Sequence, residues 1–112
     1  MDRRHSVQAE AVGAYREGMS LTVTNDETPS RYSVHRGDEL QGWIDYDVSA
    51  GTLRLLHAEV PPLMRNKGVG GEVVQAILDE VRESRSEPVQ PICGFVRMWM
   101  RRHPEYDELT QR

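Results

Sequence analysis

The stretch VPPLMRNKGVGGEVVQAIL, residues 60–78, joins two prolines to a cationic, glycine-rich loop and the start of an apolar helix. A helix N-terminus carries roughly half a positive charge, because its first four amide groups have no partner inside the helix and the peptide dipoles add. Gly68 and Gly70 have no Cβ, so the backbone can turn through positive φ and approach a phosphate closely. Arg65 and Lys67 add full positive charges. The stretch therefore predicts a loop that binds a diphosphate.

Two better-known phosphate-binding loops do not fit these residues. A P-loop has the pattern GxxxxGK[ST], but here Lys67 precedes the glycine and no Ser or Thr follows to hold magnesium. A dinucleotide-binding loop has the pattern GxGxxG, but Val73 occupies the position of the third glycine. The residues from Arg65 to Gly70 instead match the pattern [RQ]xxGx[GA].

A helix, a strand and a second helix are predicted after the loop. Apolar residues at helical spacing form one stripe: Val69, Val73, Val74, Ile77, Leu78 and Val81. The short apolar run from Val89 to Cys93 follows as a strand, and the crossover helix makes it parallel to the strand before the loop. Four further apolar residues predict the second helix, which Pro104 ends near Arg102 or His103: Phe95, Val96, Trp99 and Met100.

Four β-prone runs precede the loop, separated by short turn sequences. They are LTVTN (21–25), RYSVH (31–35), ELQGWIDYDV (39–48) and TLRLLHAEV (52–60). Such short connections favour an antiparallel meander, and Pro61 and Pro62 stop its last strand because proline has no N–H to donate. The predicted fold class is α+β: a mixed, mainly antiparallel sheet with a βαβ unit and helices packed on it. Trp43 and Trp99 are interpreted as core aromatics.

Composition limits the classes of function. A chain of 112 residues forms one domain, here predicted at 21–112 after a tail or frayed helix at 1–20. A formal net charge of -4 lacks the basic excess typical of nucleic-acid binding. No apolar run approaches the roughly 20 residues of a membrane span or forms a secretion signal, so a cytoplasmic location is expected. The expected oligomeric state is a monomer or weak dimer. The four histidines and the single Cys93 show no metal-ligand spacing, so no metal site is expected.

The loop and its surroundings resemble the acetyl-CoA-binding unit of the GNAT superfamily of N-acyltransferases. The resemblance extends from Leu21 to Leu109 and is strongest to small single-domain members, the YjdJ type or N-acetyltransferase-domain-containing-protein-one type. The features shared with that group are Asn25, the strand end His57–Pro61, Cys93 and the terminal Arg102–Tyr106. Two departures stand out: Ala58 replaces the usual Thr, and Asn66 and Lys67 replace a pair that commonly contains Gly, which makes the loop more cationic and less pliable.

The resemblance implies that the protein binds acetyl-CoA as acyl donor. The residues implied in coenzyme binding are Val60, Arg65, Asn66, Lys67, Gly68, Val69, Gly70 and Gly71. By similarity, the sheet should splay between the strand ending at Val60 and the strand reaching Cys93, which leaves backbone groups to pair with the pantetheine arm. Pro91 fits that splay or, equally, an edge position.

The resemblance also implies direct attack of a primary amine on the thioester. Glu59 or His57 would remove the amine proton, directly or through water, and with regular alternation both would share a strand face with Leu55. The structural alternatives are a surface carboxylate for Glu59 and a core imidazole for His57. Cys93, before a helix, would protonate the thiolate, accept the acyl group or fill space. Tyr106 would pack the C-terminus or, as in many GNAT enzymes, protonate the thiolate.

The acceptor is an amine of unknown identity: a protein lysine, an N-terminus or a polyamine. Only Asn25 to Ser30 separates the first two predicted strands, where typical GNAT domains insert helices, so the acceptor face should be open. Arg97, Arg101 and Arg102 form a solvated face or contact the coenzyme 3′-phosphate. The alternative function is a CoA-binding or protein-interaction module without turnover, which would keep the loop and dispense with Glu59, His57 and Cys93.

Overall fold

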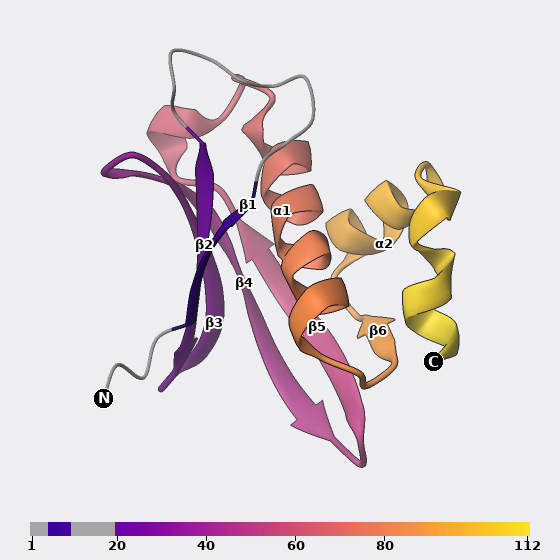
Figure 1. The fold of residues 1–112 in the computed structure, drawn as a ribbon. Helices are drawn as coiled ribbons and strands as arrows, with labels where there is room; N and C mark the ends of the chain where they lie inside the picture. The colour runs from indigo at the N-terminus through magenta and orange to yellow at the C-terminus, as the bar shows by residue number, and fades with distance from the viewer. Residues whose placement is uncertain (1–4, 10–19) are drawn as a thin grey trace.

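The computed structural model describes residues 5–9, by their backbone alone, and 20–112. Six strands form one sheet in sequence order: β1 (His5–Ala9), β2 (Leu21–Glu27), β3 (Ser30–Arg36), β4 (Glu39–Ser49), β5 (Thr52–Glu59) and β6 (Val89–Pro91). The helices are η1 (Pro62–Met64), α1 (Val69–Ser84), α2 (Gly94–Arg101) and η2 (Pro104–Gln111), where η denotes a 3-10 helix. In Figure 1, α1 runs along the sheet, with α2 and η2 beside it.

The sheet is mixed and mainly antiparallel, which confirms the predicted α+β class. β1 to β5 form an antiparallel meander, and β6 pairs in parallel with β5 after the crossover through α1. β5, α1 and β6 are therefore the βαβ unit predicted from the sequence. β6 is the edge strand and Pro91 is its last residue, so the edge position explains the proline.

One buried cluster joins the helices to one face of the sheet. The apolar stripe predicted for the first helix is buried along its whole length. Alternate residues of four strands face it: Leu21, Val23, Tyr32, Val34, Ile44, Tyr46, Leu53 and Leu55. α2 and η2 add Val96, Met100, Tyr106 and Leu109. Since alternate residues of a strand point to opposite faces, this core lies on a single side of the sheet.

The second face of the described sheet is polar and only partly covered. Its half-buried side chains include Thr22, Thr24, Arg31, Trp43, Asp45 and Arg54. Arg31 Nε donates to Asp45 Oδ1 at 2.6 Å, and the Arg31 guanidinium lies 4.7 Å from the centre of the Trp43 ring. Trp43 is therefore not a core residue, contrary to the prediction. Trp99 is also half-buried: it packs on the edge of the core and stacks on His103 at 3.8 Å.

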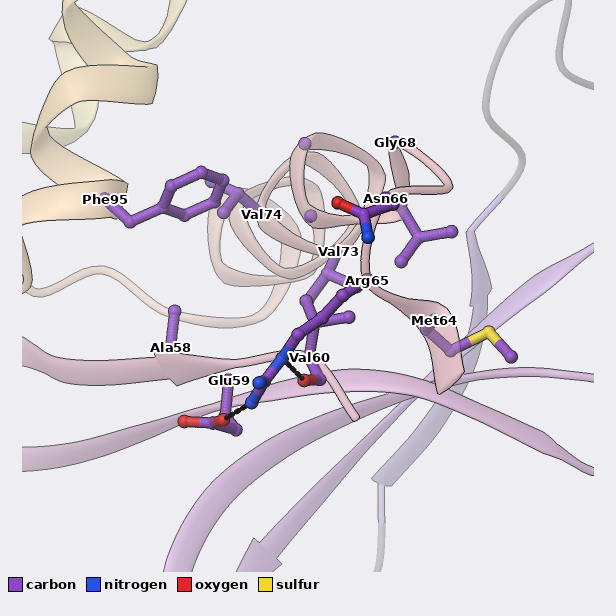
Figure 2. A pocket seen from close by; sticks show the side chains of 13 residues that line it. Ala58, Glu59, Val60, Met64, Arg65, Asn66, Gly68, Val73, Val74 and Phe95 are labelled. Carbon is purple, nitrogen blue, oxygen red and sulfur yellow. Dashed lines mark hydrogen bonds and ion pairs between the residues drawn. The ribbon is translucent and has the colours of Figure 1, made fainter. Parts of the chain in front are cut away.

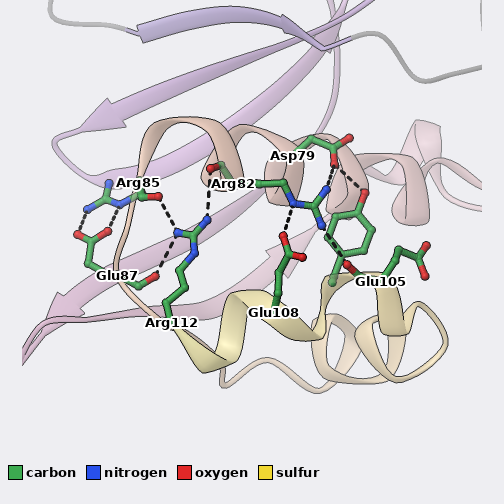
Figure 3. Close-up of polar contacts among 8 residues, drawn as sticks. Asp79, Arg82, Arg85, Glu87, Glu105, Glu108 and Arg112 are labelled. Atoms are coloured by element: carbon green, nitrogen blue, oxygen red, sulfur yellow. Dashed lines mark hydrogen bonds and ion pairs between the residues drawn. The ribbon is translucent and has the colours of Figure 1, made fainter.

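Polar contacts attach the C-terminal segment to α1 (Figure 3). Arg82 donates to Glu108 at 2.8 Å and to the Glu105 carbonyl at 3.0 Å. Arg112 donates to the Arg85 carbonyl at 2.6 Å, at the end of the helix, where the terminal carbonyls lack intrahelical partners. Tyr106 is 4% exposed and donates to Asp79 at 2.6 Å. It therefore packs the C-terminus, which is one of the two roles predicted for it.

The N-terminal segment differs from the expected tail or frayed helix. Residues 5–9 form β1, antiparallel to β2, with His5 opposite Asn25 and Ala9 opposite Leu21. The remainder of the predicted tail, apart from Ser20, lies outside the described residues. With β1 in the sheet, the first inter-strand connection is 10–20 and not the hairpin near Asn25 to Ser30. The short hairpin at Asn25 to Ser30 is therefore no longer a reason to expect an open acceptor face.

Candidate active site

A pocket of about 590 Å³ lies where the end of β5, the glycine-rich loop and the N-terminus of α1 meet (Figure 2). Its lining residues are Ala58, Glu59, Val60, Met64, Arg65, Asn66, Gly68, Val69, Gly70, Gly71, Val73, Val74 and Phe95. All the residues predicted to bind coenzyme are among them except the exposed Lys67. Phe95 comes from α2, so the helix that follows the βαβ unit also contributes to the pocket.

The loop reaches the helix start through two residues with left-handed backbone. Asn66 has φ 68° and Gly68, the N-cap of α1, has φ 73°. Asn tolerates this conformation better than most residues with a side chain, and Gly adopts it without steric cost. The turn brings the first amides of α1 to the pocket, where the positive end of the helix dipole favours an anion.

Gly70 does not have the left-handed backbone predicted for it, and both Gly70 and Gly71 lie close to α2. A Cβ on Gly70 would lie 3.0 Å from Phe95 Cζ, and one on Gly71 would lie 3.2 Å from Trp99 Nε1. Neither has positive φ. These two glycines therefore let the start of α1 approach α2 closely, whereas Gly68 supplies the turn together with Asn66.

The pairing of β5 with β6 stops before β5 ends. The last pair is Leu55 with Pro91, and the Leu55 carbonyl also accepts the amides of Ile92 and Cys93 at 2.9 and 3.0 Å. The chain then turns into α2, while β5 continues to Glu59. β5 therefore extends four residues beyond its last pair with β6, and its end, Ala58 and Glu59, lines the pocket.

A β-bulge reverses the side-chain alternation at the end of β5. Asp45 of β4 lies opposite His57 but Tyr46 lies opposite Leu55, so Leu56 is the extra residue. As a result Leu55 and Ala58 both face the core, whereas His57 is exposed. Figure 2 shows Ala58 pointing toward Phe95 and Glu59 pointing to the other side of the strand. The expectation that Leu55 shares a face with His57 and Glu59 is therefore wrong.

Glu59 joins His57 to Arg65 in a chain of three polar side chains. His57 Nε2 lies 2.8 Å from Glu59 Oε1, and Arg65 Nη2 donates to Glu59 Oε2 at 2.6 Å. Arg65 Nε donates to the Val60 carbonyl at 3.0 Å. The hydrogen bond from His57, and secondarily the one from Arg65, hold the pKa of Glu59 below its ordinary value. Glu59 is thus a carboxylate near neutral pH.

The sequence profile of the GCN5-related N-acetyltransferases matches residues 31–109. The chain belongs to this GCN5-related N-acetyltransferase (GNAT) family. The match includes the βαβ unit, the glycine-rich loop and the three hydrogen-bonded residues His57, Glu59 and Arg65. Acyl transfer is the general chemistry of GNAT proteins, and the observed sheet and helices are consistent with the GNAT fold. No curated protein has a sequence significantly similar to this one.

The three residues predicted to act chemically do not form one cluster in this GNAT domain. Glu59 lines the pocket and contacts His57, which lies on the outer face beside it. Cys93, the N-cap of α2, is half-buried, packs against the core and does not line the pocket. The structure therefore pairs the two candidate bases and leaves the thiol on the helix side.

Phe95 is a pocket residue that the sequence pattern did not predict. Phe95 was predicted on the core face of the second helix but is 47% exposed. The sequence contains a signal for this: Phe95 and Met98 are three residues apart, on a different side of the helix from Val96 and Met100.

Within residues 5–9 and 20–112, no helix is long and apolar enough to cross a membrane. The same part of the chain contains no group of three or more His, Cys, Asp or Glu side chains placed to hold a metal ion.

Proposed function

We propose that this GNAT protein is a small single-domain N-acetyltransferase of the YjdJ type that moves acetyl from acetyl-CoA to a primary amine. The main support is the pocket at the N-terminus of α1, which combines helix amides with Arg65 beside the part of β5 that extends past the end of β6. A diphosphate would bind the amides of the loop from Arg65 to Gly71. The pantetheine arm would pair with the β5 backbone beyond Leu55, where β6 has ended.

The thioester would then lie near the end of β5, between Ala58 and Val60. Glu59 accepts a proton from the ammonium form of the acceptor, directly or through water, with His57 hydrogen-bonded behind it. The amine nitrogen attacks the carbonyl carbon, a backbone amide of β5 polarises the carbonyl oxygen, and a C–N bond forms as the C–S bond breaks. The nitrogen releases a second proton and the departing thiolate takes up one, which balances the reaction.

We place the acceptor on the outer face of the sheet, where His57 and Glu59 point. Trp43 lies opposite Glu59 in the β4–β5 register, and Asp45 lies opposite His57. This face is formed by half-buried polar and aromatic side chains of β3, β4 and β5. Because this face is only partly covered, it suits a protein lysine, a protein N-terminus or a polyamine better than a small metabolite that must be enclosed.

Thiol release from acetyl-CoA, measured with a panel of amines, tests this function. Glu59→Gln and His57→Ala should lower kcat by about 100-fold or more if each acts in proton transfer, and Cys93→Ala should do so only if the thiol takes part. Calorimetry with CoA supplies the control. Binding of CoA without thiol release for any amine would support the alternative, a CoA-binding module without turnover, and absence of CoA binding would overturn both functions.

A further inference from the structure

We propose that Arg65 is shared between the Glu59 carboxylate and the diphosphate of the coenzyme, so that Glu59 and the diphosphate compete for it. This inference rests on the proposed function, since it takes acetyl-CoA or CoA as the ligand. It adds a role that the proposed mechanism lacks: a link between coenzyme occupancy and the candidate base.

The first observation is the position of Arg65. It is the first residue after η1, it lines the pocket beside the amides of α1, and its side chain extends from the loop back to the end of β5 (Figure 2). There it holds two acceptors, the Val60 carbonyl at 3.0 Å and Glu59 Oε2 at 2.6 Å. The same guanidinium therefore faces both the candidate anion site and the candidate base.

The second observation is which donors are in use. The bonds to Val60 and Glu59 use Nε and Nη2, which form one of the two edges that a guanidinium offers to an anion. Neither bond involves Nη1. A phosphate can take the edge formed by Nη1 and Nη2, or it can displace Glu59 from Nε and Nη2. In both arrangements the phosphate draws on the positive charge that now stabilises the Glu59 carboxylate.

The third observation is that the contact between Arg65 and Glu59 is exposed enough to exchange. The Arg65 side chain is 54% exposed and that of Glu59 is 30% exposed. Exposed ion pairs contribute little free energy, so a diphosphate bound at a helix N-terminus can compete with the carboxylate for the guanidinium. His57 keeps its own contact with Glu59 Oε1 and is not part of the exchange.

Coenzyme binding then changes the state of Glu59. When the Arg65 guanidinium binds the diphosphate, the Glu59 carboxylate loses one of its two stabilising partners and becomes a better proton acceptor. Arg65 is thus a positioning residue that makes Glu59 most basic when the acyl donor is bound. Linkage requires the converse as well: removing the Glu59 charge frees Arg65 and tightens coenzyme binding by the same factor.

A double-mutant cycle with CoA as the probe, followed by isothermal titration calorimetry, tests the competition. Glu59→Gln should tighten CoA binding about 2- to 5-fold, the range expected for release of an exposed ion pair. Arg65→Gln should weaken it, and in the Arg65→Gln background the Glu59→Gln change should have no effect beyond about 1.5-fold. If Glu59 instead positions Arg65 for the phosphate, Glu59→Gln weakens CoA binding and the proposal fails.

Two further variants separate the contact from simple repulsion between anions. Glu59→Asp keeps the charge but shortens the side chain, so it should tighten CoA binding as Glu59→Gln does; binding equal to the wild type would contradict the proposal. Glu72, in the first turn of α1, pairs with Arg36 at 2.6 Å and does not contact Arg65. Glu72→Gln should therefore change CoA affinity by the same factor with and without Arg65→Gln.

The failure of this inference differs from the failure of the proposed function. If the folded wild type shows no heat with CoA, the proposed function fails and the competition fails with it. If the wild type binds CoA but the Glu59→Gln factor is the same in both Arg65 backgrounds, only the competition is overturned. Circular dichroism melts of each variant establish that the proteins compared are folded.

Discussion

At the scale of single residues, the glycine-rich loop contains glycines with different physical functions. Gly68 supplies backbone conformation: its φ is 73°, and a Cβ there would meet nothing within 4 Å. Gly70 supplies space: its backbone needs no glycine, but a Cβ would lie 3.0 Å from Phe95 Cζ. The [RQ]xxGx[GA] pattern requires Gly at position 68 and accepts Ala at position 70, which agrees with a turn at Gly68 and ordinary helical backbone at Gly70, but the pattern does not show that Phe95 lies against Gly70.

Alanine substitutions at these two glycines should therefore have opposite profiles. Gly68→Ala forces a side chain into the left-handed region and should lower the free energy of unfolding by about 1–2 kcal/mol. Gly70→Ala gains helix propensity and should leave that free energy nearly unchanged, but the added methyl group displaces the exposed Phe95 ring from its place in the pocket wall. We expect it to weaken CoA binding about tenfold, the loss of one good apolar contact. Urea unfolding and calorimetry measure the two quantities.

The control for this pair is Phe95→Ala combined with Gly70→Ala. Without the ring, the added methyl group meets no neighbour in α2, so the double variant should bind CoA no more weakly than Phe95→Ala alone. Equal losses of stability in Gly68→Ala and Gly70→Ala would contradict the assignment of separate functions.

At the scale of elements, periodicity predicted most of the fold and missed the features that set the site. The alternation of apolar residues predicted β2 to β5, and the spacing of valines predicted α1, because each pattern repeats over several residues. The bulge at Leu56 is a single extra residue, and the sequence TLRLLHAE continues through it without a glycine or other marker. The faces of His57 and Glu59 therefore could not be inferred from alternation alone.

β1 was missed for another physical reason. Residues 5–9 read HSVQA, which has few β-branched or aromatic residues and no apolar alternation strong enough to predict a strand. Its place in the sheet comes from backbone pairing with β2. In the predicted meander β2 is the first strand, so one of its edges is unpaired and can accept a further strand. An edge strand of this kind depends on its neighbour more than on its own sequence.

The docking of η2 on α1 should make the stability of the protein fall in alkaline solution. Burial, and secondly the hydrogen bond to Asp79, raise the pKa of Tyr106 from 10.0 to about 12. Below pH 10 the phenol is protonated in both the folded and the unfolded chain, and its contribution to stability is complete. Between pH 10 and about pH 12 the unfolded chain releases the proton first, so the free energy of unfolding should decrease as the pH rises.

Tyr106→Phe tests this prediction. Phenylalanine does not titrate, so the variant should show a shallower loss of stability above pH 10, measured by urea unfolding at a series of pH values. Some slope will remain, because burial also raises the pKa of Tyr32. Identical slopes for the variant and the wild type would contradict the prediction.

At the scale of the whole molecule, the two faces of the sheet differ in character. The helix face holds the core and, at its edge, the pocket at the start of α1, while the outer face carries polar side chains and few apolar ones. The end of β5 contributes side chains to both faces, because Ala58 points to one side and Glu59 to the other. A donor on the helix side and an acceptor on the outer side would meet at that strand end without sharing a pocket.

This separation predicts that the two substrates can be perturbed independently. Trp43 lies on the outer face under the Arg31 guanidinium, opposite Glu59 in the register, and it does not line the pocket beside α1. Trp43→Ala removes the largest aromatic surface beside the candidate base. We therefore expect KM for the amine to rise about tenfold, a typical loss for one aromatic contact, while CoA affinity by calorimetry stays within about twofold. The matched control is Phe95→Ala on the helix side, which should weaken CoA binding and leave KM for the amine nearly unchanged. If Trp43→Ala weakens CoA binding as much as it raises KM, the two substrates share one surface and the division of the sheet into donor and acceptor faces is wrong.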